Sequence, residues 1–360
     1  MYEVPARLEA RRLARGVAAG LGFFLAAVLL AAQSASPAAA GEAALKAAEW
    51  RAAVADFQLA LKADPAQPRL WASLGVAQAA LGRYAAAAAA DRRALRLYPR
   101  LRAARVNLAL AEFKRGRYAA AAAAFERYRR DFSRADFRAT LLEANCELNL
   151  VQYARAIALA TRLLPAARDN PLLDYILGVA YFSQANAAAG APWLRRLAGH
   201  VSDPQARTLL ADAHGRLAML LLKNGHTAAA LRHFRQAEAL DPNNYDTNFY
   251  LGYLHRQRGE WKAAEIHLRR AMALSPRAAG PRYQLGLLEL TLGHPHRALP
   301  LLRAAVRLQP GNVTAHVQLA QLYFRLHRPR RGAREQARVQ RLLARQHASS
   351  SPAPLRPHHP

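Results

Sequence analysis

Two groups of histidines are the side chains of this sequence best suited to metal binding or proton transfer. His214, His226 and His233 lie close together along the chain, and His294 and His296 form a second group. Imidazole nitrogens bind zinc and exchange protons near neutral pH. Both groups are expected at turns or on exposed helix faces, however, where a histidine is usually solvated. The sequence therefore predicts neither a metal site nor a cofactor.

Other catalytic signatures are absent from the sequence. It contains no glycine-rich phosphate loop, no His-Glu-x-x-His helix and no Gly-x-Ser-x-Gly turn. The single cysteine, Cys146, lies in an apolar segment beside Leu142, Leu148 and Leu150, where a buried and unreactive thiol is expected. One cysteine also excludes an internal disulfide and a zinc site built on several thiolates. We expect a protein that is not an enzyme.

Composition favours helices and a strongly basic surface. Hydrophobic residues make up 52% of the 360 residues, which excludes a wholly disordered chain. Alanine-rich blocks such as 85–90 and 119–124 favour helix over sheet. Lys and Arg number 52 against 24 Asp and Glu, a net charge of +28. Such a charge favours acidic partners, polyanions or phospholipid headgroups, but it does not define a fold.

Prolines and glycines recur at a fixed spacing of 34 residues. Pro65 and Pro99 are one spacing apart, and Pro242, Pro276 and Pro310 repeat it twice. Five glycines follow the same register: Gly82, Gly116, Gly225, Gly259 and Gly293. Apolar residues occur at helical spacing on both sides of each glycine. Each unit is therefore predicted to be two helices joined by a tight turn.

These units resemble the tetratricopeptide repeat family, whose repeat is a 34-residue helix–turn–helix. In the clearest unit, Trp71, Leu74 and Gly75 stand at the family's first-helix positions. The turn, helix-crossing and final positions of that unit are held by Gly82, Tyr84, Ala87 and Pro99. An alanine–aromatic pair recurs in the second helix as Ala53 with Phe57, Ala121 with Phe125, and Ala230 with Phe234. The resemblance implies an all-α, right-handed superhelical solenoid of about nine repeats, covering nearly all of residues 41–345.

The middle of the chain departs from the regular repeat. We expect two sub-arrays, residues 41–170 and 171–345. Residues 160–210 are either a joint between these sub-arrays or an insertion within one continuous superhelix. Pro192 should break the second helix of the fifth unit, because proline removes a backbone donor and clashes with the preceding turn. Pro204, after Ser202 or Asp203, is typical of a helix start.

The two ends of the chain are expected to lie outside the repeats. Residues 1–40 predict a signal peptide, with a basic leader, an uncharged apolar stretch over 16–32 and small residues at 38–40 for cleavage. An uncleaved N-terminal membrane anchor is the alternative. Either segment places the body outside the cytoplasm, in the periplasm or on the outer face of the inner membrane. Residues 346–360, rich in Ser, Pro and His, are predicted to be a disordered tail.

In this family the first helix of each repeat lines the groove of the superhelix, and its projection onto this sequence gives a candidate partner-binding groove. Its aromatic members are Tyr175, Phe182, Phe249, Tyr250, Tyr253, Tyr283 and Phe324. Its basic members are Arg216, Lys223, Arg256 and Arg325. Tyr and Arg supply much of the binding energy where a pocket excludes water. The predicted ligand is an extended or helical peptide with acidic groups, although each aromatic residue could instead pack between helices.

The carboxylate clamp of chaperone-binding family members is not predicted. That clamp needs Lys and Asn at set first-helix positions, and the matching positions here hold residues such as Ala72, Val76, Val106 and Leu110. Only Asn107 fits.

The last helical segment, residues 329–345, is expected to cap the solenoid with a polar outer face. It could also contact anionic membrane surfaces through Arg330, Arg331, Arg334 and Arg338. The predicted function is a non-catalytic protein-interaction scaffold in a bacterial cell envelope. The alternative is a polyanion- or membrane-surface-binding protein that acts through its arginines. Nucleic acid is not an expected partner.

Overall fold

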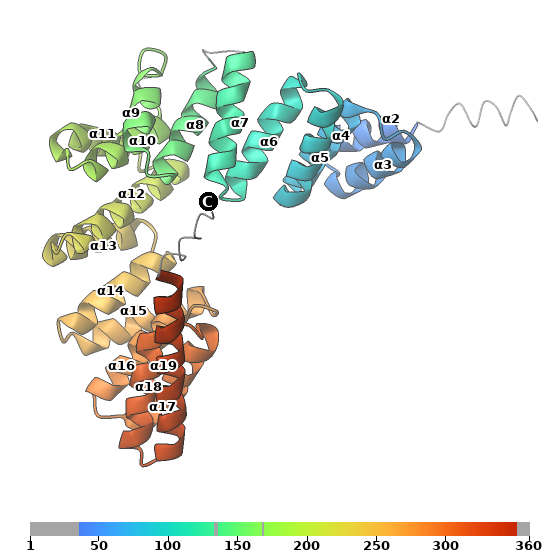
Figure 1. Cartoon of the computed structure of the whole chain (residues 1–360). Helices are drawn as coiled ribbons and strands as arrows, with labels where there is room; N and C mark the ends of the chain where they lie inside the picture. The colour runs from blue at the N-terminus through green and yellow to red at the C-terminus, as the bar shows by residue number, and fades with distance from the viewer. Residues whose placement is uncertain (1–35, 133–135, 168, 351–360) are drawn as a thin grey trace, which may run out of the picture. The chain divides into compact units, whose positions relative to one another are not determined.

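The computed structural model describes residues 36–132, 136–167 and 169–350, and these residues form helices and no strands. Figure 1 shows the succession of helices along the chain. The helices are α2 (Pro37–Lys46), α3 (Trp50–Ala63), α4 (Pro68–Ala80), α5 (Tyr84–Leu97), α6 (Arg102–Lys114), α7 (Tyr118–Asp131), α8 (Phe137–Asn149), α9 (Tyr153–Thr161), α10 (Pro171–Ser183), α11 (Ala187–Gly199), α12 (Pro204–Lys223), α13 (Thr227–Leu240), α14 (Tyr245–Gln257), α15 (Trp261–Leu274), α16 (Ala279–Thr291), α17 (Pro295–Leu308), α18 (Val313–Arg325) and α19 (Pro329–Ser350).

The helices are paired in chain order, from α2 with α3 to α18 with α19. Each pair packs together, and its second helix packs against the first helix of the next pair within the same unit. The nine pairs in the described residues match the predicted number of repeats. The predicted all-α helix-pair solenoid is therefore confirmed.

The chain divides into two compact units, Met1–Arg168 and Asp169–Pro360. The described helices of the first unit are α2–α9, and those of the second unit are α10–α19. None of the described helices is both long and apolar enough to cross a membrane. Most of the predicted signal peptide or anchor, residues 1–35, lies outside the described residues.

A residue with positive φ joins the two helices of every pair. Five pairs have the glycines that mark the sequence period, with φ between 70° and 81°. The other four pairs have Ala48, Val151, Ala185 and His327, with φ between 54° and 64°. Glycine reaches this left-handed region without steric cost, whereas a residue with a Cβ atom is strained there. The glycine pattern thus predicts five of the nine turns.

Small residues of the first helix receive large residues of the second helix in the core of the pairs. A Cβ atom added at Gly41 would lie 2.7 Å from the ring of Phe57, and one added at Gly252 would lie 2.6 Å from Leu268. Phe57 and Leu268 are fully buried. This close approach explains why the repeats pair a glycine or alanine with a bulky apolar residue, since core packing leaves no room for a second large side chain.

The helix start predicted at Pro204 is confirmed, because Oδ1 of Asp203 accepts a hydrogen bond from the backbone N–H of Gln205 at 2.9 Å. The break predicted at Pro192 is wrong, because α11 continues through it. Pro192 cannot donate to the carbonyl group of Ala188, four residues earlier. Both residues are exposed, so water can bind that carbonyl group.

The C-terminal helix is longer than predicted. α19 continues to Ser350, so residues 346–350 of the expected disordered tail are helical. Basic and polar side chains continue beyond the expected end, and neither proline nor glycine occurs before Pro352 to stop the helix. Residues 351–360, the rest of that tail, lie outside the described residues.

Candidate protein-binding face

The first helices form the inner face of each unit. In the first unit α2 contacts α4 and α4 contacts α6, and in the second unit α10 contacts α12 and α14 contacts α16. No comparably extensive contact joins two second helices among the described residues. Neighbouring elements of a curved array approach most closely on its inner side. The predicted groove residues of the second unit lie on these first helices.

Aromatic rings gather at the start of α14. The rings of Phe249 and Tyr250 meet edge to face, with centroids 5.2 Å apart. Tyr250 also stacks on Phe234 of α13, and Phe249 stacks on Tyr245. Gly280 of α16 makes room for Phe249, since a Cβ atom there would lie 2.9 Å from its ring. Phe249 and Tyr250 are half-buried, so packing fixes two rings that still present surface.

Further along the same face, Tyr253, Arg256 and Tyr283 are also half-buried. The hydroxyl group of Tyr253 accepts a hydrogen bond from Nε2 of Gln257 at 3.1 Å. Nε of Arg256 donates to Oε1 of Gln284 in α16 at 2.9 Å. Burial raises the pKa of Tyr283, so its hydroxyl group remains protonated. The contact of Arg256 links α14 to α16, and the contact of Tyr253 lies within α14.

The remaining predicted groove residues lie in different surroundings. Tyr175 is only 3% exposed, and its hydroxyl group donates to Asp212 of α12, so its ring is a packing residue. Phe182 lines a pocket of about 340 Å³ with the leucines at the end of α12. Phe324 packs on Gly332 of α19 and is still 39% exposed. Lys223 and Arg325 are exposed.

Sequence reasoning missed two acidic residues on this face. Asp212 of α12 and Asp246 of α14 line a pocket of about 310 Å³ together with Arg216. They are 34 residues apart, so they occupy the same position in consecutive repeats. The 34-residue spacing marks this equivalence in the sequence, whereas the net charge of +28 favours the arginines as binding residues.

The structure also brings together two histidines that were expected to be solvated. The Nδ1 atoms of His214 in α12 and His233 in α13 lie 3.1 Å apart. Burial and the neighbouring His233 lower the pKa of His214 to about 4, and burial lowers the pKa of His233. The prediction of solvated rings is therefore wrong for this pair, because facing helices enclose it. His294 is exposed, as predicted.

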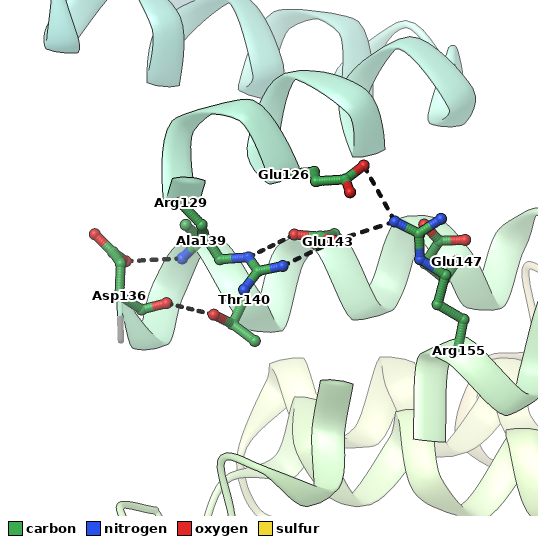
Figure 2. Close-up of polar contacts among 8 residues, drawn as sticks. All are labelled: Glu126, Arg129, Asp136, Ala139, Thr140, Glu143, Glu147 and Arg155. Carbon is green, nitrogen blue, oxygen red and sulfur yellow. Dashed lines mark hydrogen bonds and ion pairs between the residues drawn. The ribbon is translucent and has the colours of Figure 1, made fainter. Parts of the chain in front are cut away.

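The first unit uses part of its arginine excess internally, as Figure 2 shows. Glu143 of α8 is fully buried and accepts hydrogen bonds from Nε and Nη2 of Arg129 in α7, at 2.6 and 3.1 Å. Arg155 of α9 lies 3.3 Å from the equally enclosed Glu147. These two arginines neutralise acids between helices, and the side chain of Arg129 is itself largely buried. Cys146, between the two acids, is fully buried.

The arginines of helix α19 contrast with those of the first unit, because they are exposed on the outer side of the helix. Arg330, Arg331, Arg334 and Arg338 are all exposed. Val339 is buried, and Nδ1 of His316 in α18 lies 2.6 Å from Oε2 of Glu335. The helix therefore packs on α18 with one side and presents a basic outer side.

Among the described residues no group of three or more His, Cys, Asp or Glu side chains could hold a metal ion. With paired helices throughout and half-buried aromatic residues on the first helices, the described chain has the form of an α-helical repeat solenoid, a class that acts chiefly in protein–protein interaction. Sequence models of the tetratricopeptide repeat match residues 38–101, 106–171 and 216–279, and a second such model matches 279–322. These matches cover more than half of the chain, which therefore belongs to the tetratricopeptide repeat family.

Solved structures with a similar arrangement include the APC/C hetero-tetramer Cut9-Hcn1, with a TM-score of 0.42 and 16% identity over 75% of this chain and 48% of the other. This chain thus spans about half the length of that relative. MamA from Desulfovibrio magneticus RS-1, residues 41 to the end, has a TM-score of 0.40 and 20% identity over 50% of this chain and 97% of its own. A comparison with curated protein sequences finds no match.

Proposed function

We propose that this protein is a non-catalytic scaffold that binds a peptide or protein partner on the inner face of its second unit. The observation that carries this proposal is the packed aromatic group of Phe249 and Tyr250, continued along α14 by Tyr253 and Arg256. Rings held by their neighbours lose little conformational freedom on binding, and Tyr and Arg are frequent hot-spot residues.

A pull-down tests the proposal. The full chain serves as bait for an envelope extract, with washes at about 0.1 M and about 1 M salt, on either side of strong electrostatic screening. We expect a discrete protein to be retained at high salt and to be released by Tyr253→Ala. Tyr98→Ala is the matched control, since Tyr98 is an exposed tyrosine of the first unit. Both variants are checked for unchanged helix content. Equal retention by wild type and Tyr253→Ala would contradict the proposal.

We place this scaffold in the cell envelope, as the N-terminal sequence predicts. The predicted cleavage point after Ala40 lies inside α2, which begins at Pro37 and is capped by Ser36. Cleavage there would remove the first turn of α2 and the packing of Ala38 against the core. This favours the uncleaved anchor over the signal peptide. The mass of the chain recovered from the whole envelope, periplasm and membranes together, tests the choice, because a chain starting at Gly41 would mean cleavage.

The exposed arginines of α19 favour a second candidate, the binding of a polyanion or an anionic membrane surface. Arginine contacts with such surfaces weaken steeply as salt rises. Sedimentation with vesicles of phosphatidylcholine and phosphatidylserine distinguishes this candidate. Loss of vesicle binding in the Arg330→Gln/Arg334→Gln variant would support this candidate. Equal binding to vesicles with and without phosphatidylserine would exclude it.

A further inference from the structure

One pocket of the inner face is acidic, although the chain as a whole is strongly basic. It lies between α12 and α14 in the second unit and has a volume of about 310 Å³. The residues that line it include Asp212, Arg216, Met219, Phe234, Asp246 and Thr247.

The two carboxylates of the pocket differ in their partners. Asp212 accepts hydrogen bonds from the hydroxyl group of Tyr175 and from Nε of Arg216, the latter at 2.7 Å. Asp246 makes no hydrogen bond or ion pair with any residue that the structure describes. Burial and the nearby Asp212 raise its pKa. Asp246 is thus a carboxylate without an ion pair among the described residues, because the Arg216 of the same pocket pairs with Asp212.

The rest of the pocket suits the stem and head of a long basic side chain. Met219, which is 43% exposed, and the fully buried Phe234 both line the pocket and give it apolar surface. Thr247 is only 3% exposed, and its hydroxyl group makes no hydrogen bond with a described residue. Lysine and arginine bury their methylene groups on apolar surface while the cationic head finds acceptors. With two carboxylates and one guanidinium group, the lining has a net negative charge.

We propose that this pocket receives a lysine or arginine side chain of the partner, with its cationic head on Asp246 and its stem along Met219. This inference rests on the proposed function, since it names the chemistry of a partner on the same face. It departs from the acidic peptide expected from the sequence. An acidic side chain here would face two carboxylates, which disfavours binding through like-charge repulsion.

Selection from a displayed library of random peptides tests the inference. The full chain is the target, at about 0.5 M salt so that long-range attraction is screened. We expect Lys or Arg at one fixed position of the selected peptides. A selected peptide should bind Asp246→Asn about tenfold more weakly, because the loss of one charged acceptor weakens binding on this scale. Its affinity should be unchanged for Glu265→Gln. Glu265 is a half-buried acid on the second helix α15, away from the inner face, where it pairs with Arg269.

The outcomes separate this inference from the proposed function. Peptides that are selected without a basic residue, or that bind Asp246→Asn as well as wild type, would overturn the acidic pocket and leave the scaffold standing. If no peptide is selected, or if selected peptides bind Tyr253→Ala as tightly as wild type, both proposals fail together. Replacement of Lys by norleucine in a selected peptide gives an independent check, and we expect the same tenfold loss.

Discussion

The carboxyl group of Asp91 in α5 packs against Gly75 in α4, where an added Cβ atom would lie 2.8 Å from Oδ1. Other pairs fill this place with an apolar side chain such as Phe57 or Leu268. Asp91 is fully buried, and neither carboxyl oxygen has a hydrogen-bond partner among the described residues. Burial raises the pKa of Asp91 to about 8. The carboxyl group is therefore mainly protonated in the folded protein at neutral pH.

This carboxyl group should make the first unit less stable as pH rises. The folded protein holds the proton up to about pH 8, whereas the unfolded chain releases it near the ordinary pKa of 3.8. The free energy of unfolding contributed by Asp91 is thus greatest below pH 3.8 and decreases until about pH 8. Asp91→Leu should remove this slope and stabilise the unit by roughly 1–3 kcal/mol, as expected for a buried leucine.

Urea unfolding across that pH range, followed by circular dichroism, measures both effects. Asp91→Asn is the matched control, because it keeps the shape of the side chain and cannot titrate. The part of the slope due to Asp91 should disappear in both variants, so both should be more stable than wild type at neutral pH. Below pH 3.8, where Asp91 is protonated in both the folded and the unfolded state, only leucine should be more stable than wild type. A slope that persists in Asp91→Asn would assign the pH dependence to another group.

Val151 should destabilise the turn between α8 and α9. Its φ of 64° is strained for a β-branched residue. Val151→Gly is expected to raise the free energy of unfolding by up to about 1 kcal/mol. The reciprocal change, Gly116→Val in the preceding turn, should lower it by about 1–2 kcal/mol. Midpoints of urea unfolding at unchanged slope check both values, and a Val151→Gly variant less stable than wild type would show that the valine side chain stabilises the fold.

The Arg129–Glu143 pair should be worth far more than a surface ion pair. Arg129→Met leaves the fully buried carboxylate of Glu143, whose remaining ion-pair partner among the described residues is Arg155 at 3.8 Å. We expect a loss of about 3 kcal/mol. In contrast, Arg269→Met breaks an exposed pair with Glu265 and should cost at most about 0.5 kcal/mol.

A double variant identifies the cause of that loss. Arg129→Met/Glu143→Leu removes the unpaired charge together with its partner and should recover most of the stability, since apolar side chains often replace a buried ion pair without cost. The measurement is thermal unfolding of wild type, Arg129→Met, Arg269→Met and the double variant. A double variant as unstable as Arg129→Met would mean that the arginine acts through packing and not through the charge of Glu143.

The fold was largely predictable from the sequence, and the site only in part. The 34-residue period predicts the helix pairs because it reflects local backbone geometry. The turns at Ala48 and Val151 carry no glycine, so their conformation follows only from the neighbouring helices. The contact between His214 and His233 depends on how α12 and α13 face each other, which spacing along the chain does not reveal. The partner-binding role of the aromatic residues stays a prediction.

The burial of the only thiol of the chain determines how fast a thiol reagent can modify the protein. Cys146 is fully buried, and burial, followed by Glu147 and Glu143, raises its pKa to about 12. A thiol reagent can therefore modify the protein only when the α8–α9 pair opens, since both access and the thiolate form are blocked in the folded state. The rate of labelling should equal the rate of that opening when the reagent reacts faster than the pair closes, and should be proportional to the population of the open form when it reacts more slowly. In the wild-type chain, labelling of this single thiol therefore reports the local opening of one repeat.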